Sequence, residues 1–363
     1  MKIIAYYLPQ FHTFPENDKW WGKGFTEWTN VKSAKPIYKG HHQPKVPLNN
    51  NYYDLTNIET IRWQSKLAQE YGIYGFCYYH YWFSGKQIME KPMELMLADS
   101  EITLPFCISW ANHDWTKAWA QKSKEMLMQQ TYGDESDWIR HFNYLLPFFK
   151  DNRYIKIDNK PVFLLYQPQN MPVKREMFTL WNKLAMENGF AGLCYMYQHF
   201  QYNHLTDPDG DLFDYGIEYE PMYTKQRLLY TIPSLFHKVS HEILSKMNFK
   251  PHLWSSIQYK YDAAWEDILR RMPRDDKMIP GAFVDWDNSP RYGKDACFYP
   301  GYSAEKFEFY LKKQIINAKS KYRKDMIFLF AWNEWGEGGY LEPDEIEQYA
   351  RLEAVRNALA SCK

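Results

Sequence analysis

The chain alternates between short apolar runs and longer stretches in which apolar residues return every three or four positions. The short runs are apolar on both faces, which is typical of parallel strands that are covered on both sides. Eight runs have this pattern, and they predict eight buried strands at residues 3–7, 75–79, 105–110, 161–166, 192–197, 215–219, 279–285 and 326–332.

The stretches between most of these runs have the period of amphipathic helices. Ser303 is a suitable N-cap for one of them, and Pro343 fits the first turn of the last. Strands that alternate with helices in this way predict an α/β fold with a parallel sheet. The predicted helices cover residues 57–71, 136–150, 174–188, 261–271, 303–320 and 343–360.

Eight strands that mostly alternate with helices in 363 residues predict a (β/α)8 TIM barrel that occupies the whole chain, 1–363, as a single catalytic domain. A doubly wound sheet is the structural alternative. It leads us to expect a glycine-rich phosphate-binding loop after an early strand. The first run continues as "YYLPQFH", which contains no glycine, so the barrel is favoured.

Two long segments interrupt the alternation, residues 8–53 after the first predicted strand and 221–277 after the sixth. The second segment is basic and apolar and is predicted to hold extra helices. Loops at the carboxyl ends of barrel strands usually build the active site. Both segments are therefore expected to shape the mouth of a site.

Aromatic residues make up 18% of the chain, with 30 tyrosines and 15 tryptophans. Such rings fill protein cores, and they also stack on the C–H faces of sugars while their polar atoms bind hydroxyl groups. Composition alone leaves both interpretations open.

Charge and cysteine content narrow the class of partner. Basic and acidic residues balance at 44 each, so a nucleic-acid partner is not predicted. The five cysteines are scattered without a C-x-x-C pair, which predicts neither a disulfide framework nor a zinc site. The thiols are expected to be reduced, the apolar run at the N-terminus is too short for a signal peptide, and no apolar stretch is long enough to cross a bilayer. These observations predict a cytoplasmic protein.

Each predicted strand ends in aromatic and hydrogen-bonding residues. Because the carboxyl ends of barrel strands meet at one rim, these side chains are expected to form a cup that binds a carbohydrate. The alternative is that the aromatic residues simply cap the barrel. The side chains predicted to bind substrate at the strand ends are Tyr7, His80, Trp82, Trp110, Asn112, Tyr166, Tyr197, Glu218, Asp285, Arg291, Trp332 and Asn333.

The last predicted strand continues into "AWNEWGEGGYLEPD", where Glu334 and Glu337 lie beside Trp332 and Trp335. Cleavage of a glycosidic bond needs one group that protonates the leaving oxygen and another that acts as base or nucleophile. Neighbouring tryptophans desolvate a carboxylic acid and raise its pKa, as an acid at neutral pH requires. The two glutamates are therefore predicted to be catalytic. A helix-start carboxylate or a surface salt bridge is the alternative for each.

The stretch "VDWDNSPR" contains Asp285 and Asp287, and nucleotide-sugar transferases often hold a metal with such a D-x-D pair. Here the pair ends a predicted barrel strand. Binding of a sugar hydroxyl is therefore favoured over metal binding, with Arg291 orienting a carboxylate. The sequence has no Walker loop and no metal-ligand histidine spacing, so no metal and no cofactor are predicted.

The chain resembles the WbsX-type proteins of bacterial surface-polysaccharide gene clusters over nearly its whole length. The resemblance is carried by "IIAYYLPQFHTFPENDKWWGKGFTEWTNVKSAKP", "GFCYYHYWFSGK", "SWANHDWTKAW", "VDWDNSPR" and "AWNEWGEGGYLEPD". These proteins are similar to glycoside hydrolase family ninety-nine, the endo-α-mannosidases and endo-α-mannanases. That more distant likeness rests on the barrel and on the "WNEW-x-EG" stretch.

The resemblance implies a (β/α)8 barrel and a retaining mechanism without a metal. It implies that Glu334 acts as base on the 2-hydroxyl of the sugar, giving an epoxide-like intermediate, and that Glu337 acts as general acid and then as base. By looser analogy, Tyr7, Glu27 and either Trp82 or Trp110 would line the sugar site. The motif departs from the hydrolases at Gly336, where they can carry a bulkier residue.

Three functions follow as hypotheses. The first is a retaining glycosidase or transglycosidase that acts on an α-linked, mannose-like bacterial polysaccharide or its lipid-linked precursor. The second is a glycosyltransferase of lipopolysaccharide O-antigen or capsule biosynthesis, and the third is a glycan-binding barrel without activity. A mechanism in which Glu334 attacks the sugar directly and forms a glycosyl–enzyme ester stays open.

Overall fold

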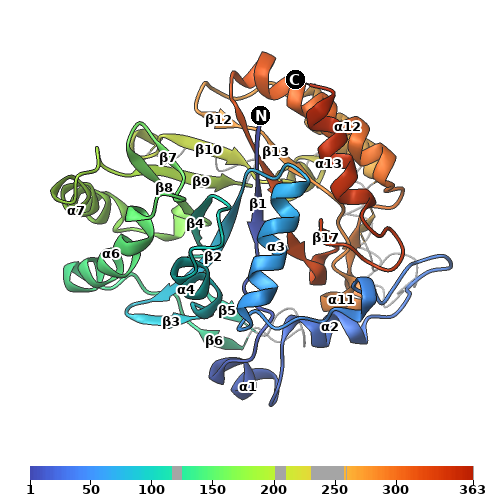
Figure 1. Cartoon of the computed structure of the whole chain (residues 1–363), viewed down its shortest axis with the longest axis horizontal. Coiled ribbons are helices and arrows are strands. Elements are labelled where there is room, and N and C mark those ends of the chain that lie inside the picture. The colour runs from blue at the N-terminus through green and yellow to red at the C-terminus, as the bar shows by residue number, and fades with distance from the viewer. Residues whose placement is uncertain (117–124, 201–209, 230–256, 259, 363) are drawn as a thin grey trace, which may run out of the picture.

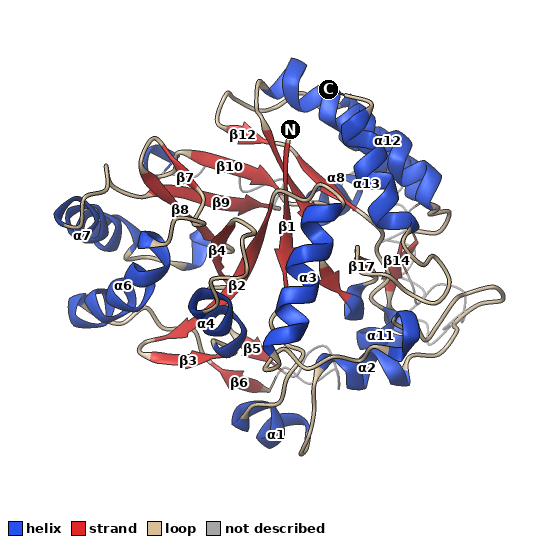
Figure 2. Cartoon of the chain, viewed as in Figure 1, coloured by secondary structure: helices blue, strands red, loops and turns tan. Residues whose placement is uncertain are grey.

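The computed structural model describes residues 1–116, 125–200, 210–229, 257–258 and 260–362 (Figure 1). Strands occupy the centre and helices surround them (Figure 2). Among the described residues, no helix combines the length and the apolar character that a membrane crossing needs.

The central sheet is parallel and nearly closed, in the order β12-β10-β9-β8-β4-β2-β1-β15-β13. β12 pairs with β10 and β13 pairs with β15, and only Pro280 separates β12 from β13. The two short strands therefore form one interrupted seventh strand that joins the two ends of the sheet, and the predicted (β/α)8 barrel is confirmed. Its strands are β1 (Lys2–Tyr7), β2 (Gly75–Phe83), β4 (Phe106–Trp110), β8 (Lys160–Leu165), β9 (Cys194–His199), β10 (Tyr215–Glu218), β12 (Met278–Ile279), β13 (Gly281–Phe283) and β15 (Met326–Phe330).

Short strands extend the barrel or pair in its loops. β3 (Lys86–Ile88) and β7 (Lys156–Ile157) pair antiparallel with β2 and β8. The other pairs are β5 (Trp115–Thr116) with β6 (Met126–Met128), β11 (Ile257–Gln258) with β14 (Cys297–Phe298), and β16 (Asn333–Glu334) with β17 (Gly339–Tyr340).

Helices cover the outside of the barrel, and α3 crosses in front of β1 in Figure 1. Side chains cap several of them: Asp134 accepts from the N–H of Asp137 at the start of α6, and Ser303 accepts from the N–H of Lys306 at the start of α12. The covering helices are α3 (Ile58–Glu70), α4 (Lys91–Ala98), α6 (Glu135–Lys150), α7 (Lys174–Glu187), α8 (Met222–Leu229), α10 (Tyr261–Arg270), α12 (Ala304–Asn317) and α13 (Ala350–Ala360). One-turn helices lie at Leu48–Asn50, Pro168–Asn170, Gly210–Leu212, Gly293–Asp295, Ala318–Tyr322 and Trp335–Glu337.

The last helix begins later than the sequence predicts. Pro343 does not lie in its first turn, because α13 begins only at Ala350. The carboxylate of Asp344 accepts from the N–H groups of Ile346 and Glu347 and holds the intervening chain in a turn.

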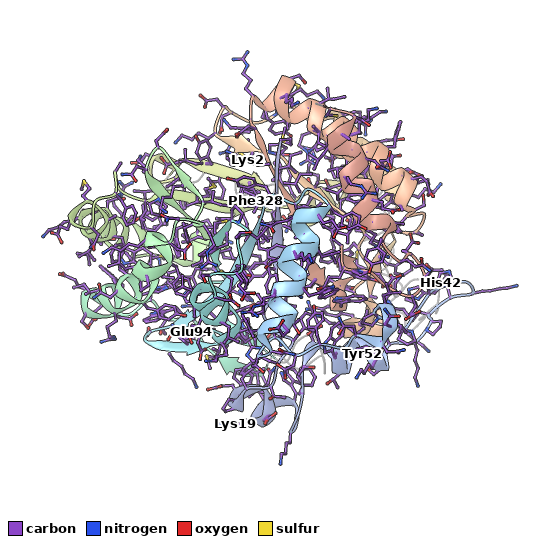
Figure 3. The ribbon with its side chains drawn as sticks, viewed as in Figure 1. Lys2, Lys19, His42, Tyr52, Glu94 and Phe328 are labelled. Carbon is purple, nitrogen blue, oxygen red and sulfur yellow. The ribbon has the colours of Figure 1, made fainter. Side chains whose placement is uncertain are left out.

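Aromatic rings fill the interior of the barrel. The ring of Tyr6 stacks on Tyr79 at 5.7 Å and meets the edge of Tyr219 at 5.2 Å. Phe328 packs on Tyr6 from β15 and lies near the centre of the molecule (Figure 3). Part of the aromatic excess therefore forms core. All five cysteines are free thiols, and four of them are buried.

The segment after β1 folds over one end of the barrel. It contains α1 (Pro15–Trp21) and α2 (Glu27–Ser33), which lie with α11 (Ser289–Tyr292) beyond the end toward which β1 runs (Figure 1). The N–H of Leu48 donates to the carbonyl of Pro343 and ties this insert to the chain after β15. Of the predicted insert 221–277, residues 230–256 and 259 lie outside the described residues.

Candidate active site

A cavity of about 530 Å³ opens at the carboxyl end of the barrel strands. Glu334, Glu337, Arg291 and Tyr166, all predicted from the sequence, line it. The set of predicted substrate residues leaves out most of the wall, which includes Leu8, Gln10, Tyr79, Tyr81, His113, Asp114, Trp115, Tyr219, Lys225, Trp286 and Tyr292. A strand that enters a barrel rim with tyrosines at alternate positions, as at Tyr79 and Tyr81, is the signal that could have found part of this set.

One guanidinium binds three carboxylates at the base of the cavity. Arg291 donates from Nε to Glu27 Oε1 at 2.7 Å, from Nη1 to Glu337 Oε1 at 2.5 Å and from Nη2 to Glu334 Oε2 at 3.2 Å. The exposed fraction of the side chain is 0% for Glu27, 7% for Glu334 and 20% for Glu337. Glu27 therefore lies behind the arginine, and the other two carboxylates face the cavity.

The two cavity-facing glutamates titrate as a pair. Burial raises the pKa of Glu334 to about 8, against the opposing charge of Arg291 and with the added repulsion of Glu337. Burial also raises the pKa of Glu337, again opposed by Arg291. Because the two carboxyl groups share one arginine, their proton belongs to the pair. Burial therefore favours a protonated carboxyl group in this pair at neutral pH.

The chain after β15 is shaped to bring both glutamates to the cavity. β16 and β17 form a small antiparallel hairpin, in which Asn333 pairs with Tyr340 and Glu334 with Gly339. The hairpin closes through the turn Trp335–Glu337 and through Gly338, whose φ of 69° is left-handed. A Cβ at Gly338 would lie 2.8 Å from the backbone nitrogen of Asp287, so the hairpin packs closely on the chain that follows β13.

The cavity wall offers rings and hydroxyl groups. The hydroxyls of Tyr79 and Tyr219 lie 2.8 Å apart and share a hydrogen bond. Burial raises the pKa of Tyr166, so its phenol stays protonated and can donate. Burial also lowers the pKa of His113 to about 4, which keeps its imidazole neutral. Such a wall can stack on a sugar ring and bind its hydroxyls.

Four predicted substrate residues instead have partners outside the cavity. Tyr7 donates its hydroxyl to Gln64 of α3, and Trp332 packs on Phe76 with ring centres 4.9 Å apart. His80 shares a 2.8 Å hydrogen bond with His141 of α6. These residues do not line the cavity, because alternate strand residues point to opposite faces. The fourth residue is Trp82, which stacks on His141 at 4.3 Å.

Trp110, Asn112 and Tyr197 also have partners outside the cavity. The edge of Trp110 contacts His141 at 4.9 Å. Asn112 exchanges two hydrogen bonds with the backbone of Gln167, and the hydroxyl of Tyr197 accepts from Arg274. These three residues hold elements together and do not line the cavity.

The remaining predicted residues are buried and bind neighbouring side chains or backbone groups. Glu218 accepts from Arg271 at 2.7 Å. Asn333 donates to the carbonyl of Leu8 and accepts from its N–H, which joins the chain after β15 to that after β1. Asp285 accepts from the N–H of Trp286, and burial raises the pKa of its carboxyl to about 6.

Asp287, the second member of the D-x-D pair, is hydrogen-bonded to the insert after β1. Asp287 shares one carboxylate oxygen between His41 at 2.8 Å and Gln43 at 2.7 Å, and its other oxygen accepts from the N–H of Ser289. Burial acts to raise the pKa of Asp287, but these hydrogen bonds hold it below its usual range. The described residues contain no group of three or more His, Cys, Asp and Glu side chains placed to hold a metal ion.

The fold and the site together define a (β/α)8 barrel protein with a buried pair of carboxyl groups at the carboxyl ends of its strands. Within that class the chain belongs to the WbsX family: the family described as Glycosyltransferase WbsX matches residues 3–355. The resemblance found in the sequence is thereby confirmed.

Individual relatives and structures agree with this placement. "Uncharacterized protein WxcX" of Xanthomonas campestris pv. campestris (strain B100) is 35% identical over 362 residues, which are 98% of this chain and 49% of the relative. WxcX of strain ATCC 33913 is also 35% identical, with the same coverage. The chain thus spans about half the length of the curated relatives it matches.

Solved structures share the fold. The GH99 endo-α-mannosidase of Bacteroides thetaiotaomicron has a TM-score of 0.60 at 12% identity, over 99% of this chain and 97% of the other. A "Glycoside hydrolase-like protein" has a TM-score of 0.59 at 13% identity, over 98% and 93% of the two chains. At these identities the likeness establishes the barrel alone.

Proposed function

We propose that this protein is a retaining glycoside hydrolase or transglycosidase that acts on an α-linked, mannose-like bacterial polysaccharide or its precursor. The observation that carries the proposal is the pair Glu334 and Glu337, buried at the carboxyl rim on one arginine and facing a ring-lined cavity. A pair of carboxyl groups that holds one proton at neutral pH supplies both functions that glycosidic cleavage needs.

The proposed reaction uses the pair in two steps. Glu334 takes the proton of the sugar 2-hydroxyl as its oxygen attacks C1, while Glu337 gives a proton to the departing glycosidic oxygen. The epoxide-like intermediate is then opened by water or by an acceptor hydroxyl, from which Glu337 takes a proton and Glu334 returns its own. Without substrate, burial favours the proton on Glu334. The proposed reaction therefore requires this proton to move to Glu337 when the sugar binds, which a coupled pair allows.

Arg291 and Glu27 support this chemistry from behind. The guanidinium contacts both cavity-facing carboxylates, so it stabilises whichever of them is charged at each step. Glu27 accepts from the remaining nitrogen and holds the plane of the guanidinium. Both residues were predicted as substrate contacts, and we now propose that Glu27 acts through Arg291.

The proposal is tested with α-linked polysaccharides, including α-mannan, as substrates. Wild-type protein is expected to release reducing sugar or to transfer it to an added acceptor. Glu334→Gln and Glu337→Gln are each expected to lower this activity by at least ~10³-fold, because each loses a proton-transfer function. Glu353→Gln, which changes an exposed carboxylate on α13, is the matched control and keeps wild-type activity.

The family description makes a glycosyltransferase the second candidate. It predicts consumption of a nucleotide sugar and no release of sugar from a finished polysaccharide. Incubation of the wild-type protein with nucleotide sugars and an acceptor glycan separates the two reactions. Turnover of a nucleotide sugar that persists in Glu334→Gln would overturn the hydrolase proposal, and saccharide binding without either reaction would leave a glycan-binding barrel.

A further inference from the structure

A third buried carboxylate follows the proposed catalytic pair along the chain. Glu342 is 1% exposed, and it faces away from the substrate cavity. Its side chain accepts from Trp335 Nε1 at 2.6 Å, from Tyr53 Oη at 2.7 Å and from Gln64 Nε2 at 2.7 Å. These three partners are neutral, and they come from the catalytic turn, the insert after β1 and helix α3.

The directions of these hydrogen bonds follow from their neighbours. The indole N–H of Trp335 can only donate. Gln64 Oε1 accepts from the hydroxyl of Tyr7, so its amide nitrogen faces Glu342 as a donor. Three donors therefore converge on the two oxygens of Glu342, which is the arrangement that binds a carboxylate.

Glu342 is also hydrogen-bonded to the chain on both sides of Glu334. Its backbone N–H donates to the carbonyl of Trp332, and its side chain accepts from Trp335. The indole of Trp335 is further held between Tyr340, stacked at 3.8 Å, and Trp28 at 5.4 Å. The rings fill space around the turn, whereas the carboxylate fixes its orientation with a directional bond.

The geometry points to Glu342 as a positioning residue that holds Trp335, and through it sets where Glu334 and Glu337 stand in the cavity. The effect on catalysis rests on the proposed function, whereas the contact between Glu342 and Trp335 does not. Glu342 touches no part of the substrate cavity, so its effect on the reaction is exerted through the turn that carries the pair.

The hydrogen bond between Trp335 and Glu342 is expected to depend on pH. Burial raises the pKa of Glu342 to about 7, although hydrogen bonds from Trp335, Tyr53 and Gln64 lower it. The other titratable groups that face it are the phenols of Tyr7 and Tyr53, whose pKa values burial raises well above 10, so they stay neutral. Below about pH 7 the acid form accepts fewer hydrogen bonds and holds the indole less firmly.

The first measurement follows the indole N–H of Trp335 by NMR in protein labelled with 15N-tryptophan. The signal is assigned by its loss in Trp335→Phe. We expect it to titrate with a midpoint near pH 7 in the wild type, and to shift without titrating in Glu342→Gln. Glu345→Gln alters a nearby exposed carboxylate and is expected to leave the signal and its titration unchanged. Tyr53→Phe, which keeps the carboxylate but removes one donor, is expected to move the midpoint upward.

The second measurement is steady-state kinetics on the polysaccharide that the wild type cleaves. Glu342→Gln is expected to lower kcat by roughly 10- to 100-fold, the worth of a hydrogen bond to a charged group, with little change in KM. An indole signal identical in Glu342→Gln and wild type, or an unchanged kcat, would overturn the inference. Wild-type protein that cleaves no polysaccharide would instead end the proposed function, while the indole titration would still decide whether Glu342 holds Trp335.

Discussion

At the scale of single residues, Gly336 is where the catalytic turn passes closest to the ion pair beneath it. A Cβ built at Gly336 would lie 1.9 Å from Glu27 Oε1 and 2.8 Å from Arg291 Nε. Both atoms belong to the 2.7 Å contact between these two side chains. The departure from the hydrolase motif thus has a physical reason: glycine leaves the room that this ion pair occupies.

Gly336→Ala is therefore expected to damage the site. The added methyl must displace Glu27, which is fully buried, and disturbs the contact that Glu27 makes with Arg291. A misplacement of about 1 Å at the pair lowers kcat/KM by about 100-fold, and the overpacking costs about 1–3 kcal/mol of unfolding free energy. Kinetics and urea unfolding measure the two effects. Gly210→Ala is the control, since a Cβ there meets nothing within 4 Å, and equal activity in both variants would contradict the prediction.

At the scale of elements, the alternation of strand residues explains which parts of the site the sequence could reveal. The strands were predictable because they are apolar on both faces, and the barrel followed from their number and from the helices between them. Because both faces are apolar, the sequence does not indicate which face of each strand points into the barrel. In β2, Tyr79 and Tyr81 line the cavity, whereas His80 and Trp82 meet α6.

The polar atoms of the outward residues misled the prediction, because a helix satisfies them. Trp82 Nε1 donates to Asp137 of α6, and His80 pairs with His141 of the same helix. The sequence gives no sign that these partners, more than 50 positions away, lie opposite the strand. Glu334, Glu337 and Arg291 were predictable because they lie beyond the ends of β15 and β13, in a short hairpin and a short helix, where alternation along a barrel strand no longer decides direction.

The contact between β2 and α6 is expected to make the protein sensitive to acid. Burial lowers the pKa of His80 to about 3, whereas an unfolded histidine titrates near 6.5. Below pH 6.5 the unfolded state therefore binds a proton that the folded state does not. Between pH 6.5 and 5 this lowers the unfolding free energy by about 2 kcal/mol for this residue.

Urea unfolding at several pH values tests this, and His80→Gln should weaken the loss of stability over that range. The control is His42→Gln, because His42 lies exposed on the insert (Figure 3). The same pH dependence in His80→Gln and wild type would show that His80 titrates normally in the folded protein.

At the scale of the whole molecule, closure of the barrel assembles a cluster that no segment contains. Glu27 comes from the insert after β1, Arg291 from the chain after β13, and Glu334 with Glu337 from the turn after β15. β15 pairs with both β1 and β13, so these three regions become neighbours at one rim. Three carboxylates then share a single guanidinium in a place from which water is largely removed.

Such a cluster is expected to lower the stability of the fold. The pKa of Glu334 rises from its usual 4.5 to about 8 on folding. From pH 4.5 to 8 the unfolded state therefore gives up a proton that the folded state keeps, and stability falls as pH rises. Glutamine does not titrate, so Glu334→Gln should be more stable than wild type at pH 8, by an amount on the order of a few kcal/mol.

The comparison needs urea unfolding of wild type and Glu334→Gln at pH 8 and again at pH 5. The advantage of the variant should shrink at pH 5, where the wild-type carboxyl is neutral in the folded state and only partly ionised when unfolded. Glu353→Gln on the surface should show no such change with pH. A variant less stable than wild type at pH 8 would mean that Arg291 stabilises Glu334 by more than burial costs it, and the pair would then be a structural ion pair that holds no proton at neutral pH.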